Sequence, residues 1–227
     1  MTHSPNSLFD FGPEAVTYER WYDTPTGRAH DRVQKQDVRT MLRPAKAREQ
    51  LLDVGCGTGH WSRFFRSLGY QVNGVDVSPE MIAVARAALP GCAFEVGDAR
   101  ALPFKDESFA VVASMATLEF IPDADAAVRE MARCAKPGGA VLIGTLNRSA
   151  TLNQQRLSSG QQPYASANLL APDELEELLR PYGSVRMVAS PVERSGARLV
   201  LARALRRYAR KPQPALSGPF IVAEARE

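Results

Sequence analysis

From residue 50 onward, short apolar runs alternate with amphipathic stretches of helical length. This alternation predicts strands over residues 50–54, 71–75, 93–96, 109–113 and 140–146, and helices over 58–68, 79–89 and 123–135. Ser78 and Pro79 support the second helix, because serine is a favoured N-cap and proline fits the first helical position. Strands that alternate with helices build parallel sheets from βαβ units. The sequence therefore predicts an α/β domain.

The segments before and after this alternation differ from it in character. Residues 1–49 hold a cluster of aromatic residues and a predicted helix over 27–42, and we interpret them as a cap or lid. Residues 50–147 are the predicted ligand-binding core. Residues 148–227 begin with a long loop rich in Ser, Asn and Gln, and continue with a helix over 172–179, a strand over 184–192, a basic helix and a strand over 218–225. Because loops of this length tend to be functional or mobile, we interpret residues 148–227 as a substrate-side insertion and the C-terminal strands of the same domain.

Composition and charge limit the classes of function. The length of 227 residues suits one domain with additions, and the formal net charge of only +3 gives no overall reason to bind nucleic acid. Cys56, Cys92 and Cys134 form no C-x-x-C pair, which argues against disulfides and against a zinc site. No apolar run approaches the roughly 20 residues of a membrane span, and the start has no signal-peptide pattern. We therefore expect a cytoplasmic protein.

Residues 51–65 read LLDVGCGTGHWSRFF, a predicted strand that passes through a glycine-rich loop into a helix. Such a loop points free N–H groups at a ligand, and its glycines let ligand atoms approach the backbone. The P-loop pattern is excluded because no lysine follows the last glycine. The dinucleotide fingerprint has its third glycine one position later than Gly59. The loop is therefore expected to bind a small polar or charged ligand, with a plain turn as the alternative.

Three aspartates lie near the carboxyl ends of the first three predicted strands. Asp53 precedes the glycine loop, where a carboxylate would repel a pyrophosphate but suits a positively charged group. Asp76 stands where a ribose-binding acid is expected in nucleotide sites. Asp98 is placed to accept a hydrogen bond from an exocyclic amine such as that of adenine. Together they predict a ligand with a ribose, a purine and a positive charge, and without phosphate.

Four motifs, LLDVGCGTGHWSRFFRSLGYQVNGVDVSPEMI, GDARALPFKDESFAVV, LEFIPD and AKPGGAVLIG, carry a family resemblance. Across residues 50–147 the chain resembles the class I S-adenosylmethionine-dependent methyltransferases, in particular the small-molecule branch that includes quinone-biosynthesis enzymes. The resemblance implies a Rossmann-like fold with a mostly parallel seven-stranded sheet, helices on both faces, an antiparallel last strand and an N-terminal lid helix. It implies S-adenosylmethionine as cofactor, S-adenosylhomocysteine as product, and a small-molecule methyl acceptor.

The resemblance also implies roles for single residues. The implied cofactor contacts are Asp53, Gly55, Cys56, Gly57, Ser114 and Met115 at the methionine part, Asp76 at the ribose, Val77 beside the adenine, and Asp98 and Ala99 at the adenine amine. Leu118 and Glu119 follow on the loop that faces the substrate. Ala110 departs from the family, whose members usually have aspartate there, and we expect little effect because that aspartate more often supports the strand.

Methyl transfer from a sulfonium needs few catalytic side chains, because the leaving group is a neutral thioether and alignment supplies most of the acceleration. A phenol or a carbon acid as acceptor would still need a base, whereas a thiolate would not. The candidate bases are His30, His60, Glu119 and Tyr22. Glu119 is the best placed, since it lies on the loop after the fourth strand, and Tyr22 is the second residue to which we assign a catalytic role. No metal site is expected.

An aromatic cluster in the first segment consists of Phe9, Phe11, Tyr18, Trp21 and Tyr22. These residues either pack the segment against the core or form a lid over the active site, where aromatic faces suit a methylsulfonium. On the second interpretation, Tyr18 contacts the cofactor. The family resemblance favours the lid.

Four alternatives concern the function and the partners of the chain. Nucleic-acid methylation is disfavoured because the N-P-P-Y type motif is absent after the fourth strand. A carboxylate metal site is disfavoured because Asp123 and Asp125 are better explained as residues that cap the start of a helix. A non-catalytic cofactor-binding module of the same fold is the rival function. The basic helix, with Arg203, Arg206, Arg207 and Arg210, is either a solvated face or a docking surface for an anionic membrane. The oligomeric state is not predicted.

Overall fold

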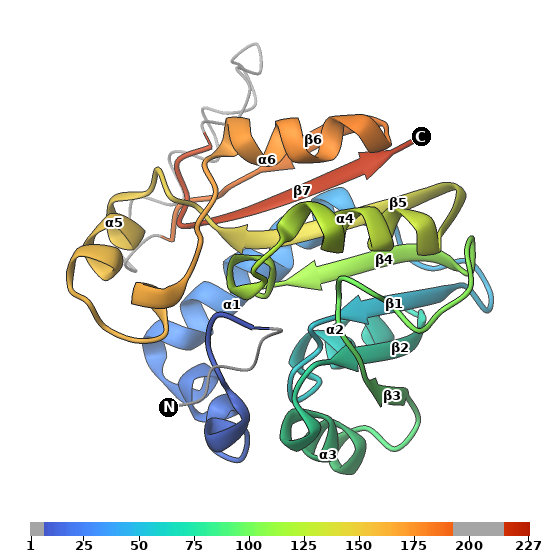
Figure 1. Ribbon diagram of the computed structural model, residues 1–227, viewed down its shortest axis with the longest axis horizontal. Coiled ribbons are helices and arrows are strands. Elements are labelled where there is room, and N and C mark those ends of the chain that lie inside the picture. The colour runs from blue at the N-terminus through green and yellow to red at the C-terminus, as the bar shows by residue number, and fades with distance from the viewer. Residues whose placement is uncertain (1–6, 193–215) are drawn as a thin grey trace, which may run out of the picture.

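A seven-stranded sheet forms the centre of the protein in the computed structural model, which describes residues 7–192 and 216–227 (Figure 1). The strand order is β3-β2-β1-β4-β5-β7-β6. The parallel strands are β1 (Gln50–Val54), β2 (Gln71–Asp76), β3 (Ala93–Val96), β4 (Phe109–Met115) and β5 (Ala135–Leu146). β7 (Phe220–Arg226) runs antiparallel to both of its neighbours, β5 and β6 (Ser184–Val188). The sheet is therefore mixed, and the predicted Rossmann-like α/β fold with an antiparallel last strand is confirmed.

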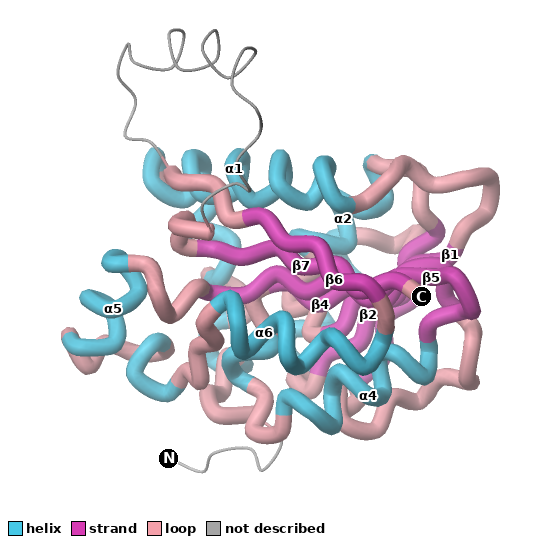
Figure 2. The backbone as a smooth tube through the Cα atoms, turned by 90° about the horizontal axis from the view of Figure 1, so that it is seen from above, coloured by secondary structure: helices cyan, strands magenta, loops and turns pink. Residues whose placement is uncertain are grey.

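Helices cover both faces of the sheet. They are α1 (Pro25–Met41), α2 (His60–Ser67), α3 (Pro79–Ala88), α4 (Ala124–Cys134), α5 (Thr151–Ser158) and α6 (Pro172–Leu179). Figure 2 shows α1 and α2 on one face, and α4 and α6 on the other. Short 3-10 turns connect the larger elements: η1 (Gly12–Glu14), η2 (Tyr18–Asp23), η3 (Leu118–Phe120), η4 (Tyr164–Ser166) and η5 (Arg180–Tyr182).

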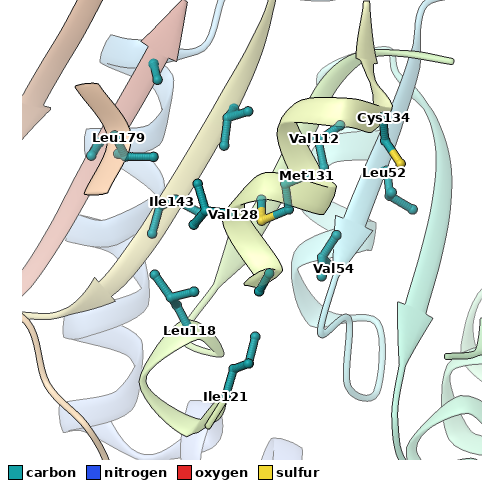
Figure 3. Close-up of a cluster of buried hydrophobic side chains, with 14 of the residues drawn as sticks. Leu52, Val54, Val112, Leu118, Ile121, Val128, Met131, Cys134, Ile143 and Leu179 are labelled. Carbon is teal, nitrogen blue, oxygen red and sulfur yellow. The ribbon is translucent and has the colours of Figure 1, made fainter. Parts of the chain in front are cut away.

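Each face of the sheet has its own apolar core, because successive side chains of a strand point to opposite faces. On one face, Leu52 and Val112 pack beneath Met131 of α4 and Leu179 of α6 (Figure 3). On the other, Leu51 of β1 contributes to a cluster that α1 and α2 cover. Burial on both sides explains why the strands read as continuous apolar runs rather than as alternating ones.

Capping side chains set where three of the helices begin. The Ser78 hydroxyl accepts a hydrogen bond from the Met81 N–H at the start of α3, and Asp123 accepts one from the Ala126 N–H at the start of α4. Both caps agree with the sequence. At α1, the Thr24 hydroxyl accepts from the Gly27 N–H, so the helix begins at Pro25, two residues before the predicted start at 27.

The long polar loop predicted after residue 147 is wrong in part, because residues 151–158 form α5. Asparagines hold this helix in place. The Asn147 amide donates to the carbonyls of Leu216 and Gly218, and the Asn153 amide donates to those of Asn147 and Pro219. Polar residues that resemble loop composition thus anchor a helix by hydrogen bonds to a segment about 70 residues away in the chain.

The strand predicted over 184–192 is shorter in the structure, since β6 ends at Val188. Ser190 leaves the sheet because its N–H and its hydroxyl both donate to the buried carboxylate of Asp37 on α1, at 2.9 and 2.7 Å. The basic helix predicted around Arg203 and Arg210 lies outside the described residues. Within residues 7–192 and 216–227, no helix is both long and apolar enough to cross a bilayer.

Candidate functional site

The glycine loop turns sharply at the carboxyl end of β1. Gly55 and Gly57 adopt positive φ values of 71° and 52°, which glycine tolerates best, and the Gly55 and Cys56 N–H groups donate to the Val75 carbonyl of β2. A Cβ on Gly55 would lie only 2.0 Å from Thr117 Cγ2, and the Thr117 hydroxyl donates to the Gly55 carbonyl at 3.0 Å. Around Gly57, by contrast, the nearest atom to a Cβ would be Met81 Sδ at 4.0 Å. Gly55 is therefore closed in by protein, whereas Gly57 faces open space.

Asp76 ends β2 with its carboxylate held by the glycine loop. One oxygen accepts from the Gly57 N–H and the other from the Ser78 N–H, each at 2.9 Å. Burial raises the pKa of Asp76 above its ordinary value, and these two N–H donors oppose the shift. A carboxylate has about four acceptor sites, so Asp76 still has lone pairs for a ligand.

A cavity of about 470 Å³, here called the glycine-loop cavity, lies over this loop. It is bounded by the ends of β1 and β2, the first turn of α3, the loop after β4, and N-terminal residues from 7 to 18. The predicted cofactor contacts on its wall are Tyr18, Gly55, Gly57, Asp76, Val77 and Ala99. The structure thus brings together residues from the lid and from three of the predicted motifs.

The other predicted cofactor contacts do not line the cavity: Asp53, Cys56, Asp98, Ser114 and Met115. Ser114 and Met115 are buried within β4, and the next two residues, Ala116 and Thr117, reach the wall instead. Asp98 pairs with Arg100, whose Nη2 lies 2.7 Å from its Oδ2 and holds the pKa of that carboxyl below its ordinary value. The roles predicted for these five residues remain predictions.

Asp53 lies beneath the loop and is almost fully buried. Its Oδ2 accepts from the Ser62 hydroxyl at 2.6 Å, but its Oδ1 finds no hydrogen-bond partner among the residues described. Burial raises the pKa of Asp53 to about 7. Burying a carboxyl group with an unpaired oxygen costs folding free energy unless a hydrogen-bond donor or a positive charge pairs with that oxygen.

A second cavity of about 300 Å³ adjoins the first. Phe11, Tyr18, Ala116 and Phe120 line both cavities and form their shared wall. Glu119, Tyr22 and His30, three of the four candidate bases, line this second cavity. The fourth, His60, lies on neither wall, and its Nε2 is 2.7 Å from Asp31.

Glu119 is the buried acid of the second cavity, with 1% of its surface exposed. Its Oε2 accepts from the Thr145 hydroxyl at 2.9 Å, and the Leu146 N–H lies 3.4 Å from its Oε1. Burial raises the pKa of Glu119 to about 7. A carboxyl with a pKa near neutrality can both accept and release a proton, which is the property expected of a general base.

Tyr22 differs from Glu119 in its protonation. Its ring stacks on the His60 imidazole with centroids 3.7 Å apart, and burial raises its pKa well above the ordinary value. The phenol therefore stays protonated near neutral pH and offers a hydrogen-bond donor rather than a base. Burial and the charge of Arg156 lower the pKa of His30, so that the imidazole is neutral there.

The N-terminal segment is attached to the core at several points. The Leu8 N–H donates to the Phe120 carbonyl at 2.8 Å, and the Thr58 hydroxyl of the glycine loop donates to Glu19 at 3.0 Å. The Phe11 and Phe120 rings meet edge to face at 4.9 Å. These contacts hold the aromatic cluster against the core beside both cavities, and the role of the segment as a lid remains a prediction.

Several wall residues were assigned no role from the sequence. Thr117 and Phe120 belong to the loop after β4, and Arg156 and Tyr164 come from the segment that was expected to be a loop. Figure 1 shows α5, which carries Arg156, at the end of the sheet to which the arrows of β1, β4 and β5 point. In the part of the chain that the structure describes, no three His, Cys, Asp or Glu side chains form a group that could hold a metal ion.

Known proteins that are similar to this chain include methyltransferases. A model of the methyltransferase domain matches residues 52–143. A malonyl-[acyl-carrier protein] O-methyltransferase of Serratia marcescens is 38% identical over 98 residues, which are 43% of this chain and 38% of that protein. A ubiquinone biosynthesis O-methyltransferase of Xanthomonas axonopodis pv. citri is 36% identical over 161 residues, which are 65% of this chain and 66% of that protein.

Among solved structures, a SAM-dependent methyltransferase from Thermotoga maritima superimposes with a TM-score of 0.73. It is 25% identical, and the match covers 95% of this chain and 97% of that one. The chain spans less than half the length of the malonyl-[acyl-carrier protein] methyltransferases that it matches.

Proposed function

Because this chain belongs to the class I S-adenosylmethionine-dependent methyltransferases, we propose that it transfers the methyl group of S-adenosylmethionine to a small-molecule acceptor. The observation that carries the proposal is the pair of adjoining cavities. The glycine-loop cavity is the cofactor site, and the second cavity is the acceptor site. Their shared wall at Tyr18 and Ala116 is where the methyl group passes from one to the other.

The residues of the glycine-loop cavity fit the cofactor. Asp76 has free acceptor sites for the ribose hydroxyls, and Val77 and Ala99 provide apolar walls for the adenine. Gly57 leaves the backbone bare where a side chain would fill the space. Asp53 does not line the cavity, but its carboxyl group lies beneath the same loop, and a negative charge there suits a ligand that carries positive charge. Tyr18 closes the cavity from the lid.

The chemistry that bound S-adenosylmethionine supplies is an electrophilic methyl group with a neutral thioether as leaving group. The chain contributes by aligning the acceptor with the methyl group and by excluding water. In-line attack requires the nucleophilic atom of the acceptor to be held about 3 Å from the methyl carbon in a closed site. Phe11 and Phe120 contribute two packed aromatic rings to the shared wall, which favours exclusion of water. For an acceptor hydroxyl, Glu119 would accept the proton that the hydroxyl loses on methylation, because it lines the second cavity and its pKa is raised to about 7. The Tyr22 ring lines the same cavity and orients the acceptor by packing against it.

Calorimetry with S-adenosylmethionine and S-adenosylhomocysteine tests the cofactor site. The wild-type protein should bind both, and Asp76→Ala should weaken both by about tenfold or more, since hydrogen bonds to charged groups contribute about 1.5–3 kcal/mol. Asp125→Ala is the matched control, because it removes the same charge from an exposed position on α4. Failure of the wild-type protein to bind either compound at millimolar concentration would refute the proposal.

Turnover needs a separate test. Incubating the protein with a metabolite extract and a methyl donor labelled on its methyl group should label at least one small molecule. Glu119→Gln should lower that labelling without changing the affinity for S-adenosylhomocysteine, because Glu119 lines only the second cavity. Cofactor binding with no labelled product would favour the non-catalytic cofactor-binding module.

The three sequence segments act as one domain in this proposal: residues 1–49 as lid, 50–147 as cofactor-binding core, and 148–227 as substrate side and last strands. The pairing of β7 with β5 supports it, because the last segment then completes the sheet of the core. The protein acts in the cytoplasm. Contact with an anionic membrane through Arg203 and Arg210 is inferred from the sequence alone, and sedimentation with anionic vesicles at low and high salt tests it.

A further inference from the structure

The second cavity holds a positive charge that its other wall residues do not neutralise. Arg156 is half-buried, its Nη1 donates to Asn153 Oδ1 at 3.1 Å, and its guanidinium lies 4.6 Å from the centre of the Tyr164 ring. Among the described residues, no carboxylate lies within ion-pair distance of it. Two neighbours thus orient the guanidinium, which lines the cavity and has N–H donors left for a ligand.

The charge of Arg156 influences the electrostatics inside the cavity. The charge of Arg156 helps to lower the pKa of His30 on the same wall. The buried acid Glu119 does not serve as its counter-ion, because the pKa of Glu119 is raised rather than lowered. The other wall carboxylate, Glu14, is exposed to solvent. A ligand anion would therefore be stabilised beside Arg156.

The rest of the wall suits a flat ring. Aromatic side chains make up much of it: Tyr18, Trp21, Tyr22, Phe120, Tyr164 and Phe220. Aromatic pairs favour stacked and edge-to-face contacts, so these residues bind planar compounds well. The volume of about 300 Å³ lies at the small end of ligand pockets, which suits one ring with short substituents.

We propose that the second cavity binds an aryl carboxylate, with its carboxylate paired to Arg156 and its ring between the aromatic walls. This inference rests on the proposed function, because it identifies the class of methyl acceptor. Arg156 lines only the second cavity, whereas Tyr18 and Ala116 line both. The carboxylate therefore lies away from the cofactor, and the atom that is methylated is a ring substituent near the shared wall. Arginine suits this task because its planar fork pairs with both oxygens of a carboxylate.

Binding of matched probes tests the inference. Calorimetry with 4-hydroxybenzoate and its neutral analogue 4-hydroxybenzamide is carried out in the presence and absence of saturating S-adenosylhomocysteine. The wild-type protein should prefer the acid by about tenfold or more, as expected for a charge-assisted hydrogen-bonded pair. Arg156→Gln should abolish that preference by weakening the acid alone. Arg180→Gln is the control, because Arg180 is exposed on η5 and lines neither cavity.

The possible failures can be told apart. Equal affinity of the wild-type protein for acid and amide, no binding of the acid at millimolar concentration, or a preference that survives in Arg156→Gln would each overturn the inference. The comparison of acid with amide on the wild-type protein does not depend on the folding of any variant. Absence of S-adenosylhomocysteine binding, by contrast, overturns the proposed function, and it is measured in a separate titration.

Discussion

Replacing Gly55 by alanine should destabilise the folded protein for two separable reasons. The first is backbone strain, because Gly55 has a φ of 71° and a left-handed conformation costs an alanine about 1–2 kcal/mol. The second is collision, because the added Cβ would lie 2.0 Å from Thr117 Cγ2 and 2.5 Å from its Oγ1. Relieving such overpacking typically costs about 1–3 kcal/mol. We therefore expect Gly55→Ala to lower the free energy of unfolding by about 2–5 kcal/mol.

Gly138→Ala is the matched control for this experiment. Gly138 has a φ of 68°, close to that of Gly55, but a Cβ there would meet nothing within 4 Å. This variant should show only the backbone strain. The difference between the variants, about 2 kcal/mol, then isolates the contact with Thr117.

Thermal unfolding of the two variants beside the wild type measures the effect. In a protein of this size each kcal/mol lowers Tm by about 2–4 °C, so Gly55→Ala should melt about 4–8 °C below Gly138→Ala. Urea unfolding with equal slopes for all three proteins would confirm that the folded state is what changes. Equal Tm values for the two variants would refute the reasoning, because the loop would then accept a side chain where the structure has Thr117.

Three further predictions concern the two cavities. Gly57→Ala should weaken S-adenosylhomocysteine binding by about tenfold, because the added Cβ would extend into the space that the ligand needs. It should lower the free energy of unfolding by only about 1–2 kcal/mol, because the Cβ meets no protein atom closer than 4.0 Å. Loss of stability without loss of affinity would contradict this prediction. Glu119→Gln should reduce the pH dependence of stability in urea unfolding between pH 5 and 8 without abolishing it, because the pKa of Asp53 is also raised to about 7. The folded protein raises the pKa of Glu119 from 4.5 to about 7 and so binds its proton more tightly than the unfolded chain; stability therefore falls as the pH rises through this range, by about 3 kcal/mol in total, and an unchanged slope in the variant would exclude that origin. Thr58→Val should speed proteolysis before Arg28 with little change in Tm, because it removes the hydrogen bond to Glu19 that attaches the lid; unchanged cleavage would show that this bond is dispensable.

The sequence alone determined the class of fold and the cofactor loop. Alternating apolar and amphipathic stretches encode βαβ units locally, and the strands beginning at Gln50 and Ala93 have the bounds that were predicted. The spacing of the glycines and the place of Asp76 depend on a short stretch of chain, so they could be recognised without coordinates. Element ends were predicted less well where a distant partner decides them, as Asp37 does for Ser190.

The tertiary structure decided which residues share a wall. Thr117 contacts Gly55 across 62 residues of chain. Tyr18 of the N-terminal segment meets Ala116 and Phe120 of the loop after β4, and together they separate the two cavities. Arg156 reaches the second cavity because hydrogen bonds from asparagines turn a polar stretch into α5. No local sequence pattern encodes these contacts, because each depends on how elements far apart in the chain pack on the sheet. The methyl donor could therefore be identified from the sequence, whereas the walls of the proposed acceptor site became visible only in the folded protein.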